Sequence, residues 1–405
     1  MPPFVKIFLF LVAIFPNLWY NLVAVKKLGK VVIFMITLTA KVQVLPDIKQ
    51  AELLKATMSM YRDACNYVSD YISKTHDIGQ ASLHKAVYHD LRAIYELPSQ
   101  MACSVMRTVI AGYKTILSTQ RAWIAPVYKN LFCDLCWNKD YGLKQDYFSV
   151  NTLVGRIKLK YCNQGAMRYF DGTWKFGTAE LVYKHKKFFL CISVERAIPE
   201  LQIDNVINIV GVDLGINFLA TAYDSHDKTV FYHGRHVKQK RAQFKKTRQS
   251  LQKRKTASAR RKLKKIEQRE NRWMSDVNHQ VSKALVTRYP AGTMFVLEDL
   301  TGIRSQTEKV RRKDRYVMVS WAFFDLRKKI EYKAKLYGHT VIFVDPRYTS
   351  QTCPKCGCVD RHNRNKRAHV FMCKCCGYTS NDDRIGAMNL HQKGILYRQN
   401  AVMCE

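Results

Sequence analysis

The stretch Ile209-Val210-Gly211-Val212-Asp213-Leu214-Gly215 decides the fold of the C-terminal half of this chain. An apolar run that ends in an acid and a glycine is typical of a buried strand. We predict that a domain carrying chemistry begins here. Its elements are expected in this order: strand 206–223, strand 229–233, a long basic helix 237–288, strand 294–299, helix 318–337 and strand 340–345, with a last helix from about Asp383.

Three acids stand at the ends of these elements. Asp213 closes the first strand, Glu298 follows an apolar run, and Asp383 heads the last helix. Carboxylates brought together repel one another, and burying them is costly unless a cation neutralises them. The three acids therefore predict a divalent-metal site, and hard oxygen ligands favour Mg²⁺ or Mn²⁺. Two such ions about 4 Å apart can support phosphodiester hydrolysis.

Each acid taken alone also has a simpler explanation. Asp213 and Glu298 can be strand-end residues that face water, and Asp383 can be a helix N-cap. Their neighbours Asp299 and Asp382 are rival candidates, and the sequence pattern does not choose between the members of either pair.

Two CxxC pairs predict a zinc ribbon over residues 350–381. Sixteen residues separate the pairs, and a glycine follows each, which permits the tight turn of a zinc knuckle. A disulfide framework is the alternative, and His362 and His369 are weaker candidate ligands. Cys358 and Cys375 are assigned no metal. The predicted zinc ligands are Cys353, Cys356, Cys373 and Cys376.

The composition indicates a globular protein with a polyanionic partner. The chain has 405 residues, 47% of them hydrophobic, which excludes a mainly disordered protein. Lys and Arg number 67 against 32 acidic residues, and the net charge of +35 favours nucleic acid as the partner.

One segment, Arg235 to Trp273, concentrates this charge. It carries seventeen Lys or Arg and two Glu, a local net charge of +15. We expect a helix that contacts phosphates without reading bases, and a merely solvated face is the alternative.

The cysteines and the first residues of the chain are the features that concern its location in the cell. The chain has thirteen cysteines at irregular spacing, and four are grouped as metal ligands, which favours a reducing compartment, the cytoplasm. Residues 1–34 include an almost wholly apolar stretch over 4–25 that resembles a signal peptide or membrane anchor. We expect instead an over-extended start and no stable membrane association, because the better-patterned chain begins at Met35.

The N-terminal half contains one segment with helical periodicity and others with strand patterns. Residues 36–44 alternate apolar and polar side chains as a half-buried strand does, and residues 48–120 have helical periodicity. Residues 146–200 hold short β-rich runs punctuated by glycine, which predicts a small barrel or sheet that the first strand joins.

These motifs together resemble those of the TnpB (OrfB) proteins of insertion-sequence transposons, relatives of compact type V CRISPR effectors. Gly211–Gly215 is similar to the family's first RuvC motif, Leu297–Arg304 to the second, and Asp383–Leu390 to the third. The stretch Asp345–Gly357 is similar to the family's lead-in to its zinc ribbon. The resemblance covers roughly residues 35–395.

The resemblance implies a multidomain α+β fold. A β-barrel wedge domain (35–47 and 121–205) with a helical recognition insertion (48–120) would precede a RuvC or RNase H-like α/β nuclease domain (206–405) that contains the zinc ribbon. It also selects Glu298 over Asp299 and Asp383 over Asp382 as catalytic residues alongside Asp213.

The implied activity is RNA-guided, metal-dependent cleavage of DNA. The expected partners are a guide RNA from the transposon end and a double-stranded DNA target, which base pairing would read. The expected cofactors are structural Zn²⁺ and catalytic Mg²⁺ or Mn²⁺. The alternatives are a transposase that joins strands, a nuclease-inactive DNA-binding protein of the same family, and a Holliday-junction resolvase.

Overall fold

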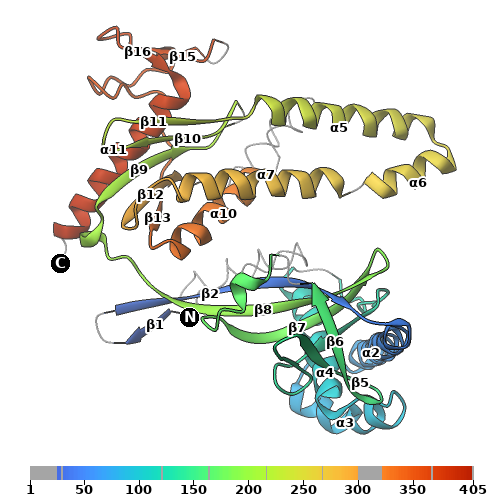
Figure 1. The fold of residues 1–405 in the computed structure, drawn as a ribbon. Coiled ribbons are helices and arrows are strands. Elements are labelled where there is room, and N and C mark those ends of the chain that lie inside the picture. Colours follow the sequence, from blue (N-terminus) through green and yellow to red (C-terminus); the bar gives the residue numbers. More distant parts are fainter. Residues whose placement is uncertain are drawn as a thin grey trace. The chain divides into compact units, whose positions relative to one another are not determined.

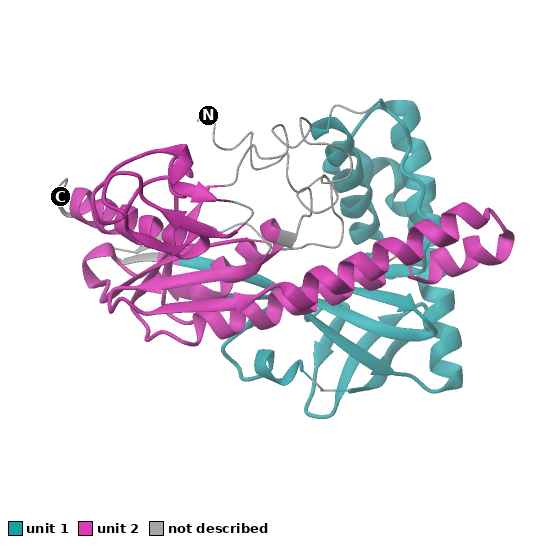
Figure 2. Cartoon of the chain, turned by 90° about the horizontal axis from the view of Figure 1, so that it is seen from above, with its two compact units in different colours: residues 1–26, 34–197 teal, residues 27–33, 198–405 magenta. Residues whose placement is uncertain are grey.

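The structure, a computed structural model, describes residues 25–28, 31–119, 122–162, 165–215, 217–266, 268–299, 322–365 and 368–403. Most of the expected over-extended start lies outside these residues, as do residues 300–304 of the second motif. The chain forms two compact units, which Figure 2 colours separately: residues 1–26 with 34–197, and residues 27–33 with 198–405. Among the helices described, none combines the length and apolarity needed to cross a bilayer.

Unit 1 contains an eight-stranded sheet (Figure 1). Tyr141 on its last strand donates a hydrogen bond of 2.7 Å to the carbonyl oxygen of Gly177 on the second. The two ends of the sheet therefore approach each other, and the sheet is a nearly closed barrel. The strand order is β3 (Phe132–Leu135), β7 (Lys175–Lys184), β8 (Lys187–Pro199), β2 (Val31–Leu45), β6 (Gly155–Cys162), β5 (Tyr147–Thr152) and β4 (Tyr141–Leu143), and β1 (Val25–Leu28) pairs with β2.

Three helices are inserted between β2 and β3: α2 (Ile48–Thr75), α3 (Gln80–Ala93) and α4 (Ser99–Ser118). Asp47 begins α2 because its side chain accepts a hydrogen bond of 2.8 Å from the Gln50 amide and so caps the helix. Tyr61 of α2 is fully buried and its hydroxyl donates to Asp134 of β3 at 3.2 Å. This bond ties the helical insertion to the sheet. Strand β2, which precedes the helices in the sequence, lies between β8 and β6 in that sheet.

Unit 2 is built on a five-stranded sheet. Its order is β11 (Thr229–His233), β10 (Phe218–Asp224), β9 (Asn208–Asp213), β12 (Thr293–Glu298) and β13 (Thr340–Val344). Strand β12 runs parallel to β9 and β13, and β9, β10 and β11 are antiparallel. The prediction of one strand over 206–223 is wrong, because the chain reverses near Gly215, where a Cβ would lie 3.0 Å from the Phe218 carbonyl oxygen.

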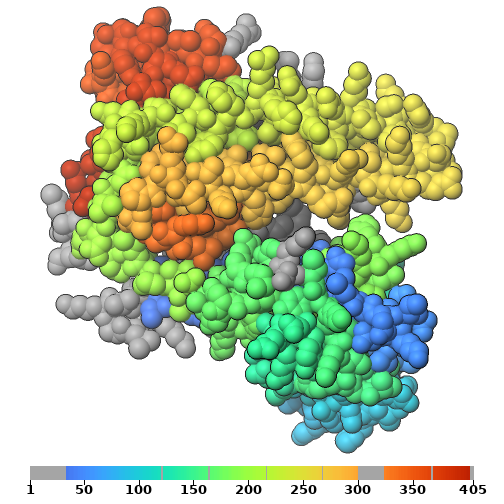
Figure 3. Space-filling view, viewed as in Figure 1, coloured from blue at the N-terminus to red at the C-terminus, as the bar shows by residue number. Residues whose placement is uncertain are grey.

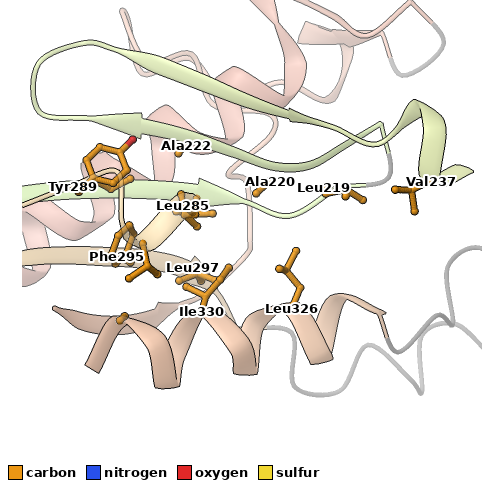
Figure 4. Packing of buried hydrophobic residues seen from close by; sticks show 14 of the residues in the cluster. Leu219, Ala220, Ala222, Val237, Leu285, Tyr289, Phe295, Leu297, Leu326 and Ile330 are labelled. Carbon is orange, nitrogen blue, oxygen red and sulfur yellow. The ribbon is translucent and has the colours of Figure 1, made fainter. Parts of the chain in front are cut away.

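Helices cover both faces of this sheet. On one face, α7 (Arg269–Val286) and α10 (Ala322–Leu336) pack Leu285, Leu326 and Ile330 against Phe295 and Leu297 (Figure 4). On the other face, α11 (Asp382–Met403) packs against β9 and β12 through the cluster Val206, Ile209, Met294, Val296 and Leu390. Unit 2 is thus a three-layer α/β/α structure, and the chain as a whole is a mixed α+β protein.

The predicted helix 237–288 is wrong in its continuity. The segment forms α5 (Arg235–Arg254), α6 (Ala257–Ile266) and α7, and α5 ends where Lys255 has a left-handed backbone with φ of 51°. Buried Glu270 of α7 binds Arg248 and, at 3.4 Å, Arg241 of α5, so the charges hold the two helices side by side. The resulting arm extends away from the sheet of its own unit (yellow in Figures 1 and 3).

A small three-stranded sheet lies between β13 and α11 in the sequence. It consists of β14 (Arg364–Asn365), β15 (Val370–Met372) and β16 (Thr379–Asn381). Its core of Cys353, Phe371 and Cys373 packs on Ile385 of α11. The predicted ribbon segment therefore rests on the first turn of the last helix.

Candidate active site

The structure places the three predicted acids on converging elements. Asp213 ends β9 and Glu298 ends β12, two parallel neighbours in which Val212 pairs with Leu297. Both carboxylates therefore leave the same edge of the sheet. Asp383 is the second residue of α11, the helix that packs across β9.

Two glycines allow α11 to approach the strand this closely. A Cβ at Gly211 of β9 would lie 2.1 Å from the Ala387 carbonyl oxygen and 2.4 Å from the His391 amide nitrogen. A Cβ at Gly386 would lie 3.0 Å from Oδ2 of Asp213. The helix backbone thus lies directly against the end of β9, as only glycine permits.

Burial raises the pKa values of all three acids. The pKa of Asp213 is well above its ordinary 3.8, first because of burial and then because of the charges of Glu298 and Asp383. Burial is also the main reason for the raised pKa of Glu298 and of Asp383. Ionising the whole group is therefore unfavourable without a compensating cation.

Each of the two neighbouring acids, Asp299 and Asp382, has an arginine partner. Asp299 accepts a hydrogen bond of 3.1 Å from Arg327 and is 41% exposed, whereas Glu298 is held from the other direction by Thr349 at 2.7 Å. Successive side chains of a strand point to opposite sides, so Glu298 and Asp299 have different partners. Asp382 is fully buried and accepts 2.9 Å from Arg364, so its charge is already partly neutralised.

The donor set fits a divalent cation. Oδ2 of Asp383 is buried without a hydrogen-bond partner, and the surrounding oxygens are the hard ligands that Mg²⁺ and Mn²⁺ prefer. Among the described residues, Asp213, Glu298 and Asp383 are not a group whose ligand atoms all lie within 4.8 Å of one another.

The four predicted ligand cysteines form a second centre. Their sulfurs all lie within 4.8 Å of one another, with Cys353 to Cys376 at 3.7 Å and Cys356 to Cys373 at 3.5 Å. Sulfurs of a tetrahedral site with metal–sulfur bonds of about 2.3 Å are about 3.8 Å apart. The four thiols therefore have the spacing to hold a metal ion such as zinc.

The two halves of this centre share one backbone pattern. Gly357 donates to the Cys353 carbonyl at 2.9 Å and Gly377 donates to the Cys373 carbonyl at 3.0 Å, and both glycines have positive φ, 71° and 72°. These turns are the reason for the glycine after each CxxC pair. Beside them, Cys358 and Cys375 are joined in a disulfide, a bond that the sequence did not predict.

Other neighbours of the acids were missed from the sequence. Thr349 lies just after β13, Arg364 lies in β14 of the small sheet, and His369 directly precedes β15. His369, Asp382 and Asp383 each offer one ligand atom, and these three atoms lie within 4.8 Å of one another. His369 therefore belongs to the acidic site and not to the cysteine centre. Only the position of Arg364 and His369 between the CxxC pairs hinted at this.

Two family models match the chain. The model described as "Probable transposase", of the OrfB group, matches residues 189–301. The model described as "Cas12f1-like, TNB domain" matches residues 323–390, which include Thr349, the four cysteines and Asp383.

Individual proteins match over longer stretches. The CRISPR-associated endodeoxyribonuclease Cas12f1 of Syntrophomonas palmitatica is 27% identical over 379 residues, covering 82% of this chain and 74% of its own. A TnpB-like protein of Methanocaldococcus jannaschii is 26% identical over 252 residues, covering 61% of this chain and 87% of its own. A Cas12f1 structure in complex with single-guide RNA and target DNA has a TM-score of 0.55 at 16% identity, covering 84% of this chain and 81% of its own, which shows a shared fold.

Proposed function

Because the chain belongs to the TnpB (OrfB) family, which is related to type V effectors, we propose that it is an RNA-guided DNA endonuclease of a transposon. It would hydrolyse DNA phosphodiesters at a RuvC-like site with Asp213, Glu298 and Asp383 as catalytic residues. The observation that carries this proposal is the convergence of three acids at one edge of the sheet. Asp383 is buried, Asp213 and Glu298 are half-buried, and the pKa of each is raised.

The side chains of this site have distinct tasks in the proposal. Asp213, Glu298 and Asp383 would hold Mg²⁺ or Mn²⁺. When bound, such a pair of ions activates a water and stabilises the leaving oxygen of the phosphodiester. Thr349 orients Glu298 by its hydrogen bond, and Arg364 lies 3.8 Å from Asp383, where its charge lowers the pKa of that acid. The close approach of α11 fixes Asp383 relative to Asp213.

The second centre would be structural. Cys353, Cys356, Cys373 and Cys376 would bind Zn²⁺ with no open coordination position, as expected of four thiolates. The zinc ribbon over 350–381 would support the acidic site, since its core packs on Ile385, two residues after Asp383.

The remaining domains would bind nucleic acid. We assign residues 35–47 and 121–205 to a wedge-like barrel, 48–120 to a helical recognition domain and 206–405 to the nuclease domain. Guide RNA and double-stranded DNA suit the net charge of +35, and the Cas12f1 structure of the same fold contains both kinds of nucleic acid. A cytoplasmic location would give the chain access to both kinds of nucleic acid. Its reducing conditions would keep the zinc thiolates reduced and would also act on the Cys358–Cys375 disulfide.

Purification with any bound RNA tests the proposal. We expect a discrete copurifying transcript, RNA-directed cleavage of matching DNA in Mg²⁺, and loss of cleavage but not of RNA-dependent DNA binding in Asp213→Ala. Asp276→Ala, at an exposed position of α7, is the matched control and should cut normally.

The alternative within the family is a transposase or a nuclease-inactive binder, which the description "Probable transposase" keeps open. Strand-transfer products from transposon ends would favour the first. RNA-dependent DNA binding without any cleavage by the unaltered chain would favour the second. Undiminished cleavage by Asp213→Ala would refute the metal assignment.

A further inference from the structure

The backbone of His369 is tied to the start of α11. This residue precedes β15 and has a left-handed backbone with φ of 55°. Its carbonyl oxygen accepts a hydrogen bond of 3.3 Å from the Asn381 side chain. Oδ1 of Asn381 in turn accepts from the amides of Asp383 and Arg384, at 3.1 and 3.2 Å, so the same residue caps the helix that carries the acid.

The imidazole of His369 reaches the loop that follows Asp213. Nδ2 of Asn217 lies 2.6 Å from Nε2 and 3.2 Å from Nδ1 of the ring. Asn217 is itself anchored, because its carbonyl oxygen accepts 2.6 Å from the Gly234 amide at the far end of β11. When Nε2 accepts from this amide, the neutral ring carries its proton on Nδ1.

Nδ1 of the ring faces a buried oxygen that has no other partner. Oδ1 of Asp382 lies 3.5 Å from it, and no hydrogen bond satisfies this oxygen. The other oxygen of Asp382 is taken by Arg364 at 2.9 Å. The imidazole therefore bridges two segments: the loop after Asp213 on one side and the Asp382–Asp383 pair on the other.

We propose that His369 is a positioning residue that sets the separation of Asp213 and Asp383 and thereby the affinity of the acidic site for its metal ions. The inference rests on the proposed function, since it assigns these acids to metal. Residues that orient metal ligands without touching the metal typically change affinity or activity by about 10- to 100-fold when they are replaced. The bridge also couples the zinc ribbon to the acids, because His369 belongs to the ribbon.

Manganese binding tests the bridge without requiring cleavage. The probe is Mn²⁺ alone, titrated into the full chain free of nucleic acid and followed by electron paramagnetic resonance. Only binding that Asp213→Ala abolishes is counted. We expect His369→Leu to weaken this binding by about 10- to 100-fold. His369→Gln should stay within about 3-fold of the unaltered chain, because its amide can accept from Asn217 and donate to Asp382.

The matched control is His362→Leu, in the same ribbon but exposed and paired only with Asp360 among the contacts described. It should bind Mn²⁺ and cut DNA normally. Asn217→Ala removes the opposite end of the bridge and should reproduce the loss of His369→Leu, which keeps the test valid if His369→Leu folds poorly. Zinc content should be unchanged in every variant.

Each outcome supports or contradicts the proposed role of His369. Normal Mn²⁺ affinity in Asn217→Ala and His369→Leu overturns the inference, and so does a loss in His369→Gln as large as in His369→Leu, which would indicate direct ligation. Loss of zinc with His369→Leu would show a structural role instead. If the unaltered chain binds Mn²⁺ in a His369-dependent way but cuts no DNA, the nuclease proposal fails while the bridge stands.

Discussion

Thr349 donates a hydrogen bond of 2.7 Å from Oγ1 to Oε1 of Glu298, and both residues lie at the edge of the sheet where the acids converge. Thr349 is 3% exposed, so water cannot replace the bond. Burial raises the pKa of Glu298, and this hydrogen bond acts in the opposite direction.

Thr349→Val should therefore weaken metal binding. The variant keeps the shape of the side chain but removes the donor that favours ionised Glu298, so Mn²⁺ affinity and the cleavage rate should fall by about 10-fold. Thr349→Ser should restore both. Thr352→Val, in the same turn and bonded to the Tyr348 carbonyl, is the control. Equal Mn²⁺ affinity in the two valine variants would contradict the role of Thr349.

Asp213→Asn should raise stability when metal is absent. The pKa of Asp213 in the folded chain is above its unfolded value near 3.8, so the folded state binds more protons between these two values. Stability is therefore lost as pH rises through that window, and the loss is complete above it. At pH 8 without metal, the melting temperature of the variant should exceed that of the unaltered chain by about 3 °C.

The difference should shrink as pH is lowered through that window. It should reverse in saturating Mg²⁺, which only the unaltered site binds well. Asp276→Asn should show neither effect. A variant less stable than the unaltered chain at pH 8 in a chelator would show that the site is not strained by its own charge.

Gly211→Ala should destabilise unit 2 severely. The added Cβ would meet backbone atoms of α11, the Ala387 carbonyl oxygen at 2.1 Å, and backbone cannot swing aside. We expect a loss of at least about 3 kcal/mol in the free energy of unfolding. Gly142→Ala, in a strand with open space at the Cβ position, is the control and should change stability by less than about 1 kcal/mol. Chemical denaturation followed by circular dichroism measures both.

Zinc content should distinguish the ligand cysteines from their neighbours. The purified chain should carry about one zinc, as expected for one four-thiolate site. Cys353→Ser should lose most of it, whereas Cys358→Ser should retain it, because Cys358 is paired with Cys375 outside the group of four. Elemental analysis of both variants is sufficient. Loss of zinc in Cys358→Ser would assign a different ligand set.

The helical arm should contribute salt-dependent affinity for nucleic acid. Lys238, Lys246 and Lys253 are exposed on α5, and a triple Gln variant should reduce the slope of log affinity against log salt by about 2, since each lost phosphate contact removes about 0.7 to 0.9. Gln243→Ala with Gln249→Ala, neutral and exposed on the same helix, should leave the slope unchanged. An unchanged slope in the lysine variant would mean that this face is only solvated.

Local patterns predicted some elements well and others poorly. The apolar run before Asp213 predicted β9, and the glycines after the CxxC pairs predicted turns that do have positive φ. The helix over 237–288 was predicted as continuous, because every residue between its breaks has acceptable helix propensity. The helix ends at α5 because α7 runs back along it, and Glu270 of α7 binds arginines of α5. This is a tertiary contact.

The sequence by itself determined the group of four cysteines, the strand that ends in Asp213 and the positive charge of the arm, because each depends on residues close together in the chain. Its local pattern did not choose between Glu298 and Asp299 or between Asp383 and Asp382. Only the tertiary structure decided which side chains surround those acids. No local pattern assigned Thr349, Arg364 or His369 to the acidic site. Asn217 meets His369 through the pairing of β9 and β10 and the packing of the small sheet on α11. Packing between distant segments brings such neighbours together, and the residue pattern within one segment does not reveal which neighbours will meet.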